Sequence, residues 1–195
     1  MKQTPQPQTP NEPQGRDLFQ TPNYAVDLLV PFIPKSIVHV WECASGEGRL
    51  GKRLMTHGYG VTFTDIRKAI SAYFNFLTDT HPQDYLDYMK KGTAIITNPP
   101  FSITRKFYNK CIEYDLPFAL LIQANYKQWL IDAVMKDDCE KIIPYRRIDY
   151  ITPTGLSGAT GQTSNFHSLW LTRGFNLGGS ETYVDLSLEE KETNI

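Results

Sequence analysis

The sequence predicts an α/β fold, a single domain built on a doubly wound, mostly parallel sheet. Short runs of β-branched and aromatic residues alternate along the chain with segments of helical periodicity, a pattern typical of parallel strands joined by crossover helices. Glycine or short polar residues directly follow three of the predicted strands, and folds of this class bind ligands at the carboxyl ends of their strands. The length of 195 residues fits one domain.

The predicted elements begin after a polar N-terminal segment. Residues 1–16 are rich in Gln, Pro and Thr, so we expect a flexible tail there and a folded domain over 17–195. Thr21 as N-cap and Pro22 at the first helical position predict a helix that continues over Tyr24–Phe32. Further strands are expected at 37–41, 61–64, 93–97, 118–122, 141–143, 166–172 and 182–186. Further helices are expected at 49–57, 66–73, 104–114 and 126–135.

The composition limits the classes of protein to consider. Hydrophobic residues make up 41% and charged residues 21% of the chain, as in globular proteins. The net charge of −1 provides no global positive field, so nucleic-acid binding would depend on a local basic patch. No apolar run approaches the roughly 20 residues of a membrane span, and the N-terminus lacks a signal-peptide pattern. We therefore expect a soluble, cytoplasmic protein.

The three cysteines, Cys43, Cys111 and Cys139, have neither metal-ligand spacing nor the arrangement of a disulfide framework. They fit small buried side chains in a reduced, intracellular setting. The sequence therefore predicts no metal site.

A glycine-rich turn follows the strand predicted at 37–41. The residues Gly46-Glu47-Gly48-Arg49-Leu50-Gly51 match G-x-G-x-x-G between a strand and a helix, and Asp65 ends the next strand. This pattern predicts a nucleoside-like ligand, because glycines allow close backbone approach and an acid can bind ribose hydroxyls. The same glycines would also suit a dinucleotide, or could serve only a tight turn.

Glu42 bears on the choice between these cofactors. It lies four residues before the first glycine, where a pyrophosphate would gain nothing from a carboxylate. A cofactor with an ammonium group would gain an ionic partner there, and S-adenosylmethionine has an ammonium group and no phosphate. A solvated turn residue is the alternative interpretation of Glu42.

The segment Asn98-Pro99-Pro100-Phe101 directly follows the apolar run 93–97. Its two prolines stiffen the backbone and donate no hydrogen bonds, so the carbonyl groups stay free to accept. Together with the amide of Asn98 and the ring of Phe101, they suit a planar group that bears an NH2, such as adenine. The alternative is a turn that only caps the strand, since Asn and Pro are common turn residues.

Five segments then stand in a particular order: Phe19-x-Thr21-Pro22, Glu42-x-x-x-Gly46-x-Gly48, Asp65, Asn75-Phe76-Leu77 and Asn98-Pro99-Pro100-Phe101. In this order and spacing the chain resembles the class I S-adenosylmethionine-dependent methyltransferases. More closely, it is similar to those that methylate N6 of adenine in DNA. The resemblance spans roughly residues 17–130, and it implies a Rossmann-like fold with S-adenosyl-L-methionine as the cofactor.

The resemblance implies a role for residues outside the glycine turn. Phe19, Thr21 and Pro22 would flank the methionine part of the cofactor. Asn75 stands where the family usually has Asp, and it would contact the adenine of the cofactor with Phe76 beside it. A polar loop residue is the alternative for Asn75.

Residues in and around the glycine turn would contact the rest of the cofactor. Glu42 and the backbone at Ala44, Gly46 and Gly48 would face its methionine and ribose. The carboxylate of Asp65 would accept hydrogen bonds from the ribose hydroxyls.

The resemblance places methyl transfer at Asn98-Pro99-Pro100-Phe101. Asn98 Oδ1 and the Pro99 carbonyl would accept the two N–H groups of the adenine amine. Its lone pair would then point toward the sulfonium methyl for a single in-line displacement. Phe101 would stack on the target base, which has to be flipped out of a DNA duplex.

A second region, residues 145–165, is expected to contact the substrate. Lys127, Arg146 and Arg147 could meet phosphates, and three glycines between 155 and 161 suggest a mobile loop. An ordinary solvated connection is the alternative. The chain has no room for a separate recognition domain, so specificity would be short or loose, or supplied by this loop or a partner.

The expected activity is methyl transfer to the N6 amine of adenine, with DNA as the expected nucleic acid. The same chemistry on an RNA adenine or a protein glutamine is an alternative, because the motif specifies a planar NH2 better than the polymer that carries it. An inactive cofactor-binding partner subunit is the alternative from another class, against which the intact residues 98–101 argue. A dinucleotide-dependent oxidoreductase would give those residues no role. The recognition sequence, any homo-oligomer and any protein partner stay open, and no membrane partner is expected.

Overall fold

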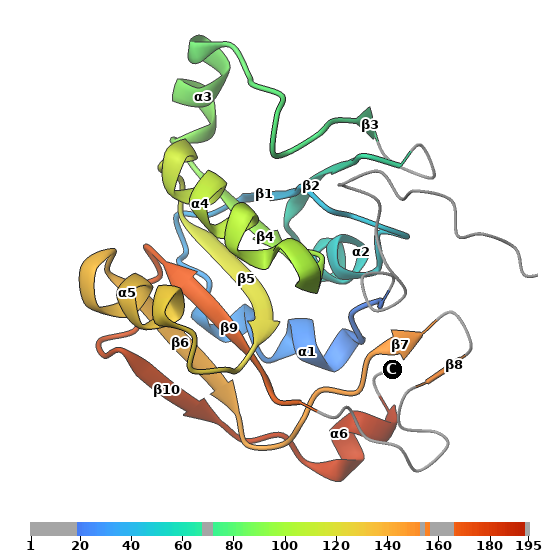
Figure 1. The fold of residues 1–195 in the computed structure, drawn as a ribbon. Helices are drawn as coiled ribbons and strands as arrows, with labels where there is room; N and C mark the ends of the chain where they lie inside the picture. Colours follow the sequence, from blue (N-terminus) through green and yellow to red (C-terminus); the bar gives the residue numbers. More distant parts are fainter. Residues whose placement is uncertain (1–18, 68–71, 153–154, 157–165, 194–195) are drawn as a thin grey trace, which may run out of the picture.

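A computed structural model describes residues 19–67, 72–152, 155–156 and 166–193 of the chain. The strands in these ranges are β1 (His39–Glu42), β2 (Gly60–Asp65), β3 (Ala72–Tyr73), β4 (Thr93–Thr97), β5 (Phe118–Gln123), β6 (Cys139–Pro144), β7 (Ile151–Thr152), β8 (Gly155–Leu156), β9 (Ser168–Arg173) and β10 (Glu181–Val184). In this described part of the chain, eight strands form one sheet in the order β10-β6-β9-β5-β4-β1-β2-β3, and β7 pairs with β8 (Figure 1).

The predicted mostly parallel sheet is confirmed. Neighbouring strands run parallel from β3 through β2, β1 and β4 to β5, and β10 runs parallel to β6. Strand β9 lies between β5 and β6 and is antiparallel to both. The strand order runs outward from β1 in one direction and from β4 in the other, so a topological switch point lies between these two strands.

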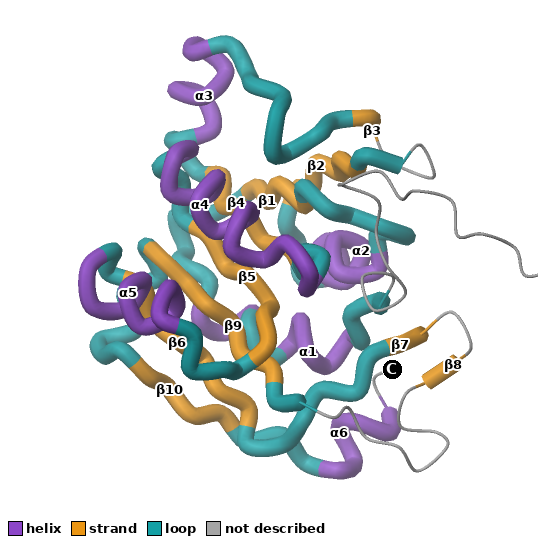
Figure 2. Tube along the Cα trace, viewed as in Figure 1, coloured by secondary structure: helices purple, strands orange, loops and turns teal. Residues whose placement is uncertain are grey.

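Helices, drawn in purple in Figure 2, lie on both faces of the sheet, whose strands are drawn in orange. The helical elements are α1 (Asn23–Asp27), η2 (Val30–Phe32), α2 (Arg49–Thr56), α3 (Gln83–Met89), η3 (Phe101–Ile103), α4 (Thr104–Tyr114), α5 (Gln128–Lys136) and α6 (Leu188–Thr193). Side chains of α1 and α2 pack with Val40, Ile96 and Trp170 in one core cluster. Those of α4 and α5 pack with Trp41 and Ile95 in a second cluster, on the viewer's side of the sheet in Figure 1. Successive residues of β1 and β4 thus point to opposite clusters, as the pleat of a strand requires.

The N-terminal part of the domain is tied to a segment far along the chain. The Tyr24 hydroxyl accepts a hydrogen bond from the Asp149 backbone N–H at 2.7 Å, and the Trp170 indole N–H donates to the Ala25 carbonyl at 2.9 Å. Gln20 and Ile151 form an antiparallel bridge, which places the chain before α1 beside β7 (Figure 1). These contacts bring residues near position 19 onto the edge of the sheet where the parallel strands end.

Two predicted helices differ from the structure. The helix predicted over Tyr24–Phe32, with Thr21 as N-cap and Pro22 at the first helical position, is instead α1 followed by the 3-10 turn η2, and Pro22 takes the N-cap position. The reason is Pro31 inside η2, which lacks a backbone N–H and disfavours a helical residue before it. The helix predicted over 66–73 is wrong at Ala72–Tyr73, which pair with Thr64 and Asp65 as strand β3.

The other predicted elements agree in type with the structure, apart from shifts at their ends. The sequence did not predict α3, α6 or the β7-β8 pair. The predicted flexible tail at 1–16 lies outside the described residues, as do residues 153–154 and 157–165 of the predicted substrate region at 145–165. Within the part of the chain that the structure describes, no helix is long and apolar enough to cross a membrane.

Gly51 sets how closely α2 approaches the sheet. A Cβ atom at this position would lie 2.4 Å from Phe63 Cε1 and 2.5 Å from Glu42 Oε2. Elsewhere in a helix, a change from Gly to Ala stabilises by up to about 1 kcal/mol. Here we expect Gly51→Ala to lower the free energy of unfolding by about 1–3 kcal/mol, because the extra methyl overpacks the contact with β1 and β2.

Urea denaturation measures this difference. Gly179→Ala is the matched control, since a Cβ atom there meets nothing within 4 Å, and its effect should stay within about 0.5 kcal/mol. Equal stability of the Gly51→Ala protein and the wild type would contradict the close approach described here.

Candidate active site

The carboxyl ends of β1, β2 and β4 lie side by side, because β1 pairs in parallel with both other strands. Glu42 ends β1, Asp65 ends β2 and Asn98 directly follows β4. The structure therefore brings these three predicted site residues to one edge of the sheet, around its topological switch point.

The glycine turn is held against the end of β2. The Gly46 N–H donates to Asp65 Oδ2 at 2.8 Å, and the Ser45 N–H donates to the Thr64 carbonyl at 3.1 Å. Gly46 and Gly48 have φ values of 54° and 73°, a left-handed conformation that glycine adopts without strain. The turn thus needs glycine at both positions, and Ala44 lies partly buried at its start.

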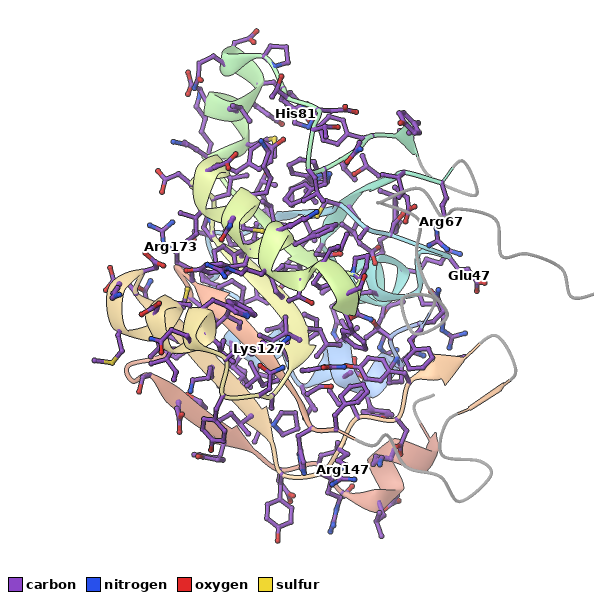
Figure 3. The ribbon with its side chains drawn as sticks, in the orientation of Figure 1. Glu47, Arg67, His81, Lys127, Arg147 and Arg173 are labelled. Atoms are coloured by element: carbon purple, nitrogen blue, oxygen red, sulfur yellow. The ribbon has the colours of Figure 1, made fainter. Side chains whose placement is uncertain are left out.

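Asp65 accepts several hydrogen bonds at the end of β2. Besides the Gly46 N–H, its carboxylate accepts from the Arg67 backbone N–H at 2.8 Å and from Arg67 Nε at 3.1 Å. Asp65 is buried, whereas the Arg67 side chain is partly exposed. Arg67 and Glu47 lie near each other beside the glycine turn at the right of Figure 3.

Glu42 is a buried carboxyl group rather than a solvated turn residue. It is 2% exposed, and its Oε2 accepts a hydrogen bond from the Gly51 N–H at 2.9 Å. Burial raises the pKa of Glu42 well above its ordinary value, the Gly51 hydrogen bond opposes this, and nearby Asp65 raises it further. Two carboxyl groups thus stand together at the start of α2, where a cation would stabilise both.

The corner after β4 holds Asn98 close to the N-terminal part of the domain. Its Nδ2 donates to the Phe19 carbonyl at 3.4 Å, and its Oδ1 is buried without a partner among the described residues. The Pro100 carbonyl accepts from the Ile103 N–H at 3.1 Å and from the Thr104 hydroxyl at 3.3 Å. No described residue donates to the carbonyl of the buried Pro99. Two acceptors therefore lie adjacent at this corner.

Aromatic rings from three separate segments surround this corner. The ring centroid of Phe101 lies 6.5 Å from that of Phe19, 5.5 Å from Tyr150 and 5.3 Å from Phe166, in each case edge to face. The Tyr150 hydroxyl donates to Ser168 Oγ at 2.7 Å, which fixes this fully buried ring. We call Phe19, Phe101, Tyr150 and Phe166 the aromatic cluster. In the structure these rings pack on one another, so a planar ligand would have to part them.

The buried side-chain atoms that lack a partner gather at the same edge. Among the described residues, these atoms are Ser45 Oγ, Arg49 Nε, Thr97 Oγ1, Asn98 Oδ1, Asn125 Oδ1 and Arg146 Nε. Arg49 begins α2, and the other residues end or closely follow one of the strands β1, β4, β5 and β6. A buried polar group without a partner destabilises a fold by about 1–3 kcal/mol, and such groups usually find a ligand or water. Their gathering at one edge makes this edge the candidate ligand site.

The other predicted cofactor residues lie in different surroundings. Thr21 and Pro22 are buried just before α1. Asn75 Oδ1 accepts from the Leu77 N–H at 3.1 Å, so it serves the turn after β3. Phe76 is 1% exposed, and its ring packs in the core at 5.2 Å from Trp41. Phe76 is thus part of the core, and Asn75 Oδ1 is already occupied by the turn.

The three predicted phosphate-binding cations do not form one cluster. Lys127 is exposed on the loop between β5 and α5, whereas Arg147 lies on the loop after β6, near α6 (Figure 3). The guanidinium of Arg146 lies 5.5 Å from the ring centroid of Tyr145. A surface that used all three cations would have to extend from β5 past β6.

Several residues at this edge were not found from the sequence. Asn125 lies two residues after β5, and Asn98 directly follows β4, so a search for amides just after predicted strands would have indicated it. From the sequence, Arg49 was considered only as a variable position of the glycine motif and was assigned no contact with the cofactor. Tyr150 and Phe166 join the aromatic cluster through contacts between distant segments, which no local pattern in the sequence reveals.

The raised pKa of the buried Glu42 carboxyl group predicts how the free energy of unfolding depends on pH. Since its pKa is raised in the folded protein, the folded state binds more protons than the unfolded state above the ordinary pKa of about 4.5. Its contribution to stability is then lost as the pH rises from about 4.5 through the folded pKa. Glu42→Gln keeps an acceptor for the Gly51 N–H and removes the titration.

We therefore expect the Glu42→Gln protein to gain stability relative to the wild type as the pH rises above about 4.5. Urea unfolding at several pH values between 4.5 and 8 measures the difference. Glu113→Gln, at an exposed carboxylate paired with Lys110, is the control and should show no such trend. A constant difference between Glu42→Gln and wild type across this range would exclude a raised pKa.

Comparisons with known proteins give a short sequence match and a broad structural one. No family model matches the chain. It is 34% identical over 47 residues to the type II methyltransferase M.EcoRI of Escherichia coli, a match that covers 24% of this chain and 14% of that protein. The chain therefore spans only a small part of this curated relative.

The fold is similar to that of solved methyltransferase structures. The crystal structure of the 23S rRNA methyltransferase ErmE superposes with a TM-score of 0.51 at 14% identity, covering 80% of this chain and 69% of that chain. A modification subunit of a putative type I restriction enzyme from Vibrio vulnificus YJ016 gives a TM-score of 0.49 at 12% identity, covering 87% and 47%. The sheet topology and the match to ErmE show the Rossmann-like fold that the resemblance to the class I methyltransferases implies.

Proposed function

We propose that this chain transfers a methyl group from S-adenosyl-L-methionine to the N6 amine of adenine, with DNA as the expected substrate. The observation that carries the proposal is the pair of acceptors at the corner after β4. Asn98 Oδ1 is buried without a partner among the described residues, and the adjacent Pro99 carbonyl also lacks one. Two acceptors beside an aromatic ring match a planar amine that has two N–H groups to donate.

The residues around the glycine turn fit the proposed cofactor. Glu42 and Asp65 present carboxyl groups that suit an ammonium group and ribose hydroxyls. Ser45 Oγ and Arg49 Nε are buried without partners in the described part of the chain, and a guanidinium suits the carboxylate of a methionine moiety. A dinucleotide is disfavoured, because its pyrophosphate would approach two buried carboxyl groups.

When bound, S-adenosylmethionine supplies an electrophilic methyl group on its sulfonium. The role of the protein in the reaction is to hold and orient the amine. By accepting both N–H groups, Asn98 Oδ1 and the Pro99 carbonyl turn the nitrogen lone pair out of the adenine ring and fix its direction. They also stabilise the positive charge that develops on the amine, in a site from which the aromatic cluster excludes water.

The aromatic cluster is suited to hold the base itself. Phe101 and Phe166 are partly buried and meet edge to face, so rotation of these rings would let a flat base stack between them. Stacking on aromatic side chains is worth about 1–3 kcal/mol per base, which helps to offset removal of the base from a duplex.

The choice of polymer rests on the relatives. The sequence match to a type II methyltransferase supports DNA, although it covers 47 residues. The structural similarity to a 23S rRNA methyltransferase keeps RNA as the second candidate. A protein glutamine presents the same planar NH2 group and has no support beyond the corner itself. The unpartnered acceptor of Asn98 also argues against an inactive partner subunit, which would have no use for it.

Asn98→Ala tests the catalytic corner. We expect it to lower kcat by about 100- to 1,000-fold, the effect of removing one preorganised hydrogen-bonding group, with little change in cofactor affinity. The assay incubates the protein with radiolabelled S-adenosylmethionine and DNA, RNA or protein, followed by digestion and identification of the methylated product. Asn109→Ala, on the exposed face of α4, is the control. Label in any product other than N6-methyladenine would refute the proposed reaction.

Asp65→Asn tests the cofactor site separately. The amide keeps the shape of the side chain and loses the charge and one acceptor, so we expect cofactor binding to weaken by about tenfold or more. Isothermal titration calorimetry with S-adenosylmethionine measures this change. Asp87→Asn, at an exposed residue of α3, should leave the affinity as it is. Wild-type protein that binds no S-adenosylmethionine would overturn the proposed function.

A further inference from the structure

A small polar hollow opens beside Phe101, between the start of α4 and the loop after β5. Its volume is about 70 Å³, enough for a phosphate group or the edge of a base but not for a whole nucleotide. Besides Phe101, it is lined by Ser102, Arg105, Gln123, Asn125, Lys127 and Trp129, among others. We call it the neighbour pocket, because it shares Phe101 with the proposed site of the target base.

The amide of Asn125 has no internal function in the described structure. Its Oδ1 is buried without a partner, and no described residue forms a hydrogen bond with its Nδ2. Nothing therefore fixes the orientation of this amide, and it can turn its acceptor or its donor toward a ligand. Amide side chains that meet base edges form paired hydrogen bonds and discriminate between bases.

The two cations of the neighbour pocket have no carboxylate within ion-pair distance among the described residues, although Asp132 of α5 interacts electrostatically with Arg105. Elsewhere on the surface, Lys136 and Lys141 each pair with a carboxylate. Within the described part of the chain, neither Arg105 nor Lys127 forms an ion pair, and both side chains are exposed. Arg105 lies in the first turn of α4, where no acidic residue is present and where a cation is unfavourable beside the helix dipole. An anion at this place would stabilise both cations and the helix end.

We propose that the neighbour pocket receives the base edge of the nucleotide next to the target adenine in the same strand. Arg105 and Lys127 hold the phosphate that joins the two nucleotides, and Asn125 contacts the edge of the neighbouring base. The inference rests on the proposed function, and it adds a site that reads sequence immediately beside the reacting base. This arrangement gives the enzyme a preference at one flanking position.

The test uses oligonucleotides of DNA and of RNA that contain one adenine flanked by each of the four bases in turn. We expect wild-type protein to prefer one base at one flanking position by about 5- to 100-fold in kcat/KM. Asn125→Ala should reduce that preference to near one. No preference in the wild type, or a preference unchanged by Asn125→Ala, overturns the role of Asn125.

A second variant tests the phosphate contact. Lys127→Gln should weaken binding for every flanking sequence and lower the salt dependence of binding by about one released counterion. A neutral methylphosphonate beside the adenine should weaken binding to wild type and have a smaller effect on the Lys127→Gln protein. Equal effects of the methylphosphonate on both proteins overturn the phosphate contact. Lys136→Gln, at the far end of α5, is the charge control, and thermal unfolding checks that each variant is folded.

The two proposals fail in different ways. If no oligonucleotide receives a methyl group that depends on Asn98, the proposed function fails. If methylation occurs and depends on Asn98, but flanking preference and salt dependence do not respond to Asn125→Ala and Lys127→Gln, the neighbour pocket alone is refuted.

Discussion

The close approach of α2 to the end of β1 is the constraint on which the site depends. Gly51 allows the helix backbone to reach the buried carboxyl group of Glu42, and its N–H donates to that group. The start of α2 is thereby fixed over the sheet edge, and the glycine turn is drawn onto the end of β2, where Gly46 bonds Asp65. A larger residue at position 51 would move the helix, the turn and both carboxyl groups together.

The other half of the site depends on contacts between distant segments. Tyr24 and Asp149, separated by 125 positions, join the start of the domain to the chain before β7. This junction brings Phe19 and Tyr150 into contact, with ring centroids 6.0 Å apart, and sets Phe19 against Asn98. The corner after β4 is therefore formed by the strand and covered by segments from both ends of the domain.

Features set by the local sequence could be predicted, whereas features set by contacts between distant segments could not. The alternation of apolar runs and helical segments is local, so the α/β class, the mostly parallel sheet and the grouping of Glu42, Asp65 and Asn98 at one edge followed from it. Pro31 interrupted a helix that periodicity alone extended, and β3 formed because an edge strand could pair with β2. The aromatic cluster arises from tertiary contacts, which one sequence does not encode in any local pattern.

The distribution of charge divides the sheet edge into two parts. Around β1 and β2 it carries the buried carboxyl groups of Glu42 and Asp65, which favour a cationic ligand and repel phosphates. Beyond β4 it carries aromatic rings, amides and the unpaired cations Arg105 and Lys127, which suit a base and its phosphates. A chain with a net charge of −1 can thus present a local positive surface here, because Arg105 and Lys127 line the same hollow and form no ion pair among the described residues. For the reaction we propose, the same division would keep a nucleic acid strand on the β4–β5 side and leave the β1–β2 side to the cofactor, so that the reacting groups would meet at the switch point between β1 and β4.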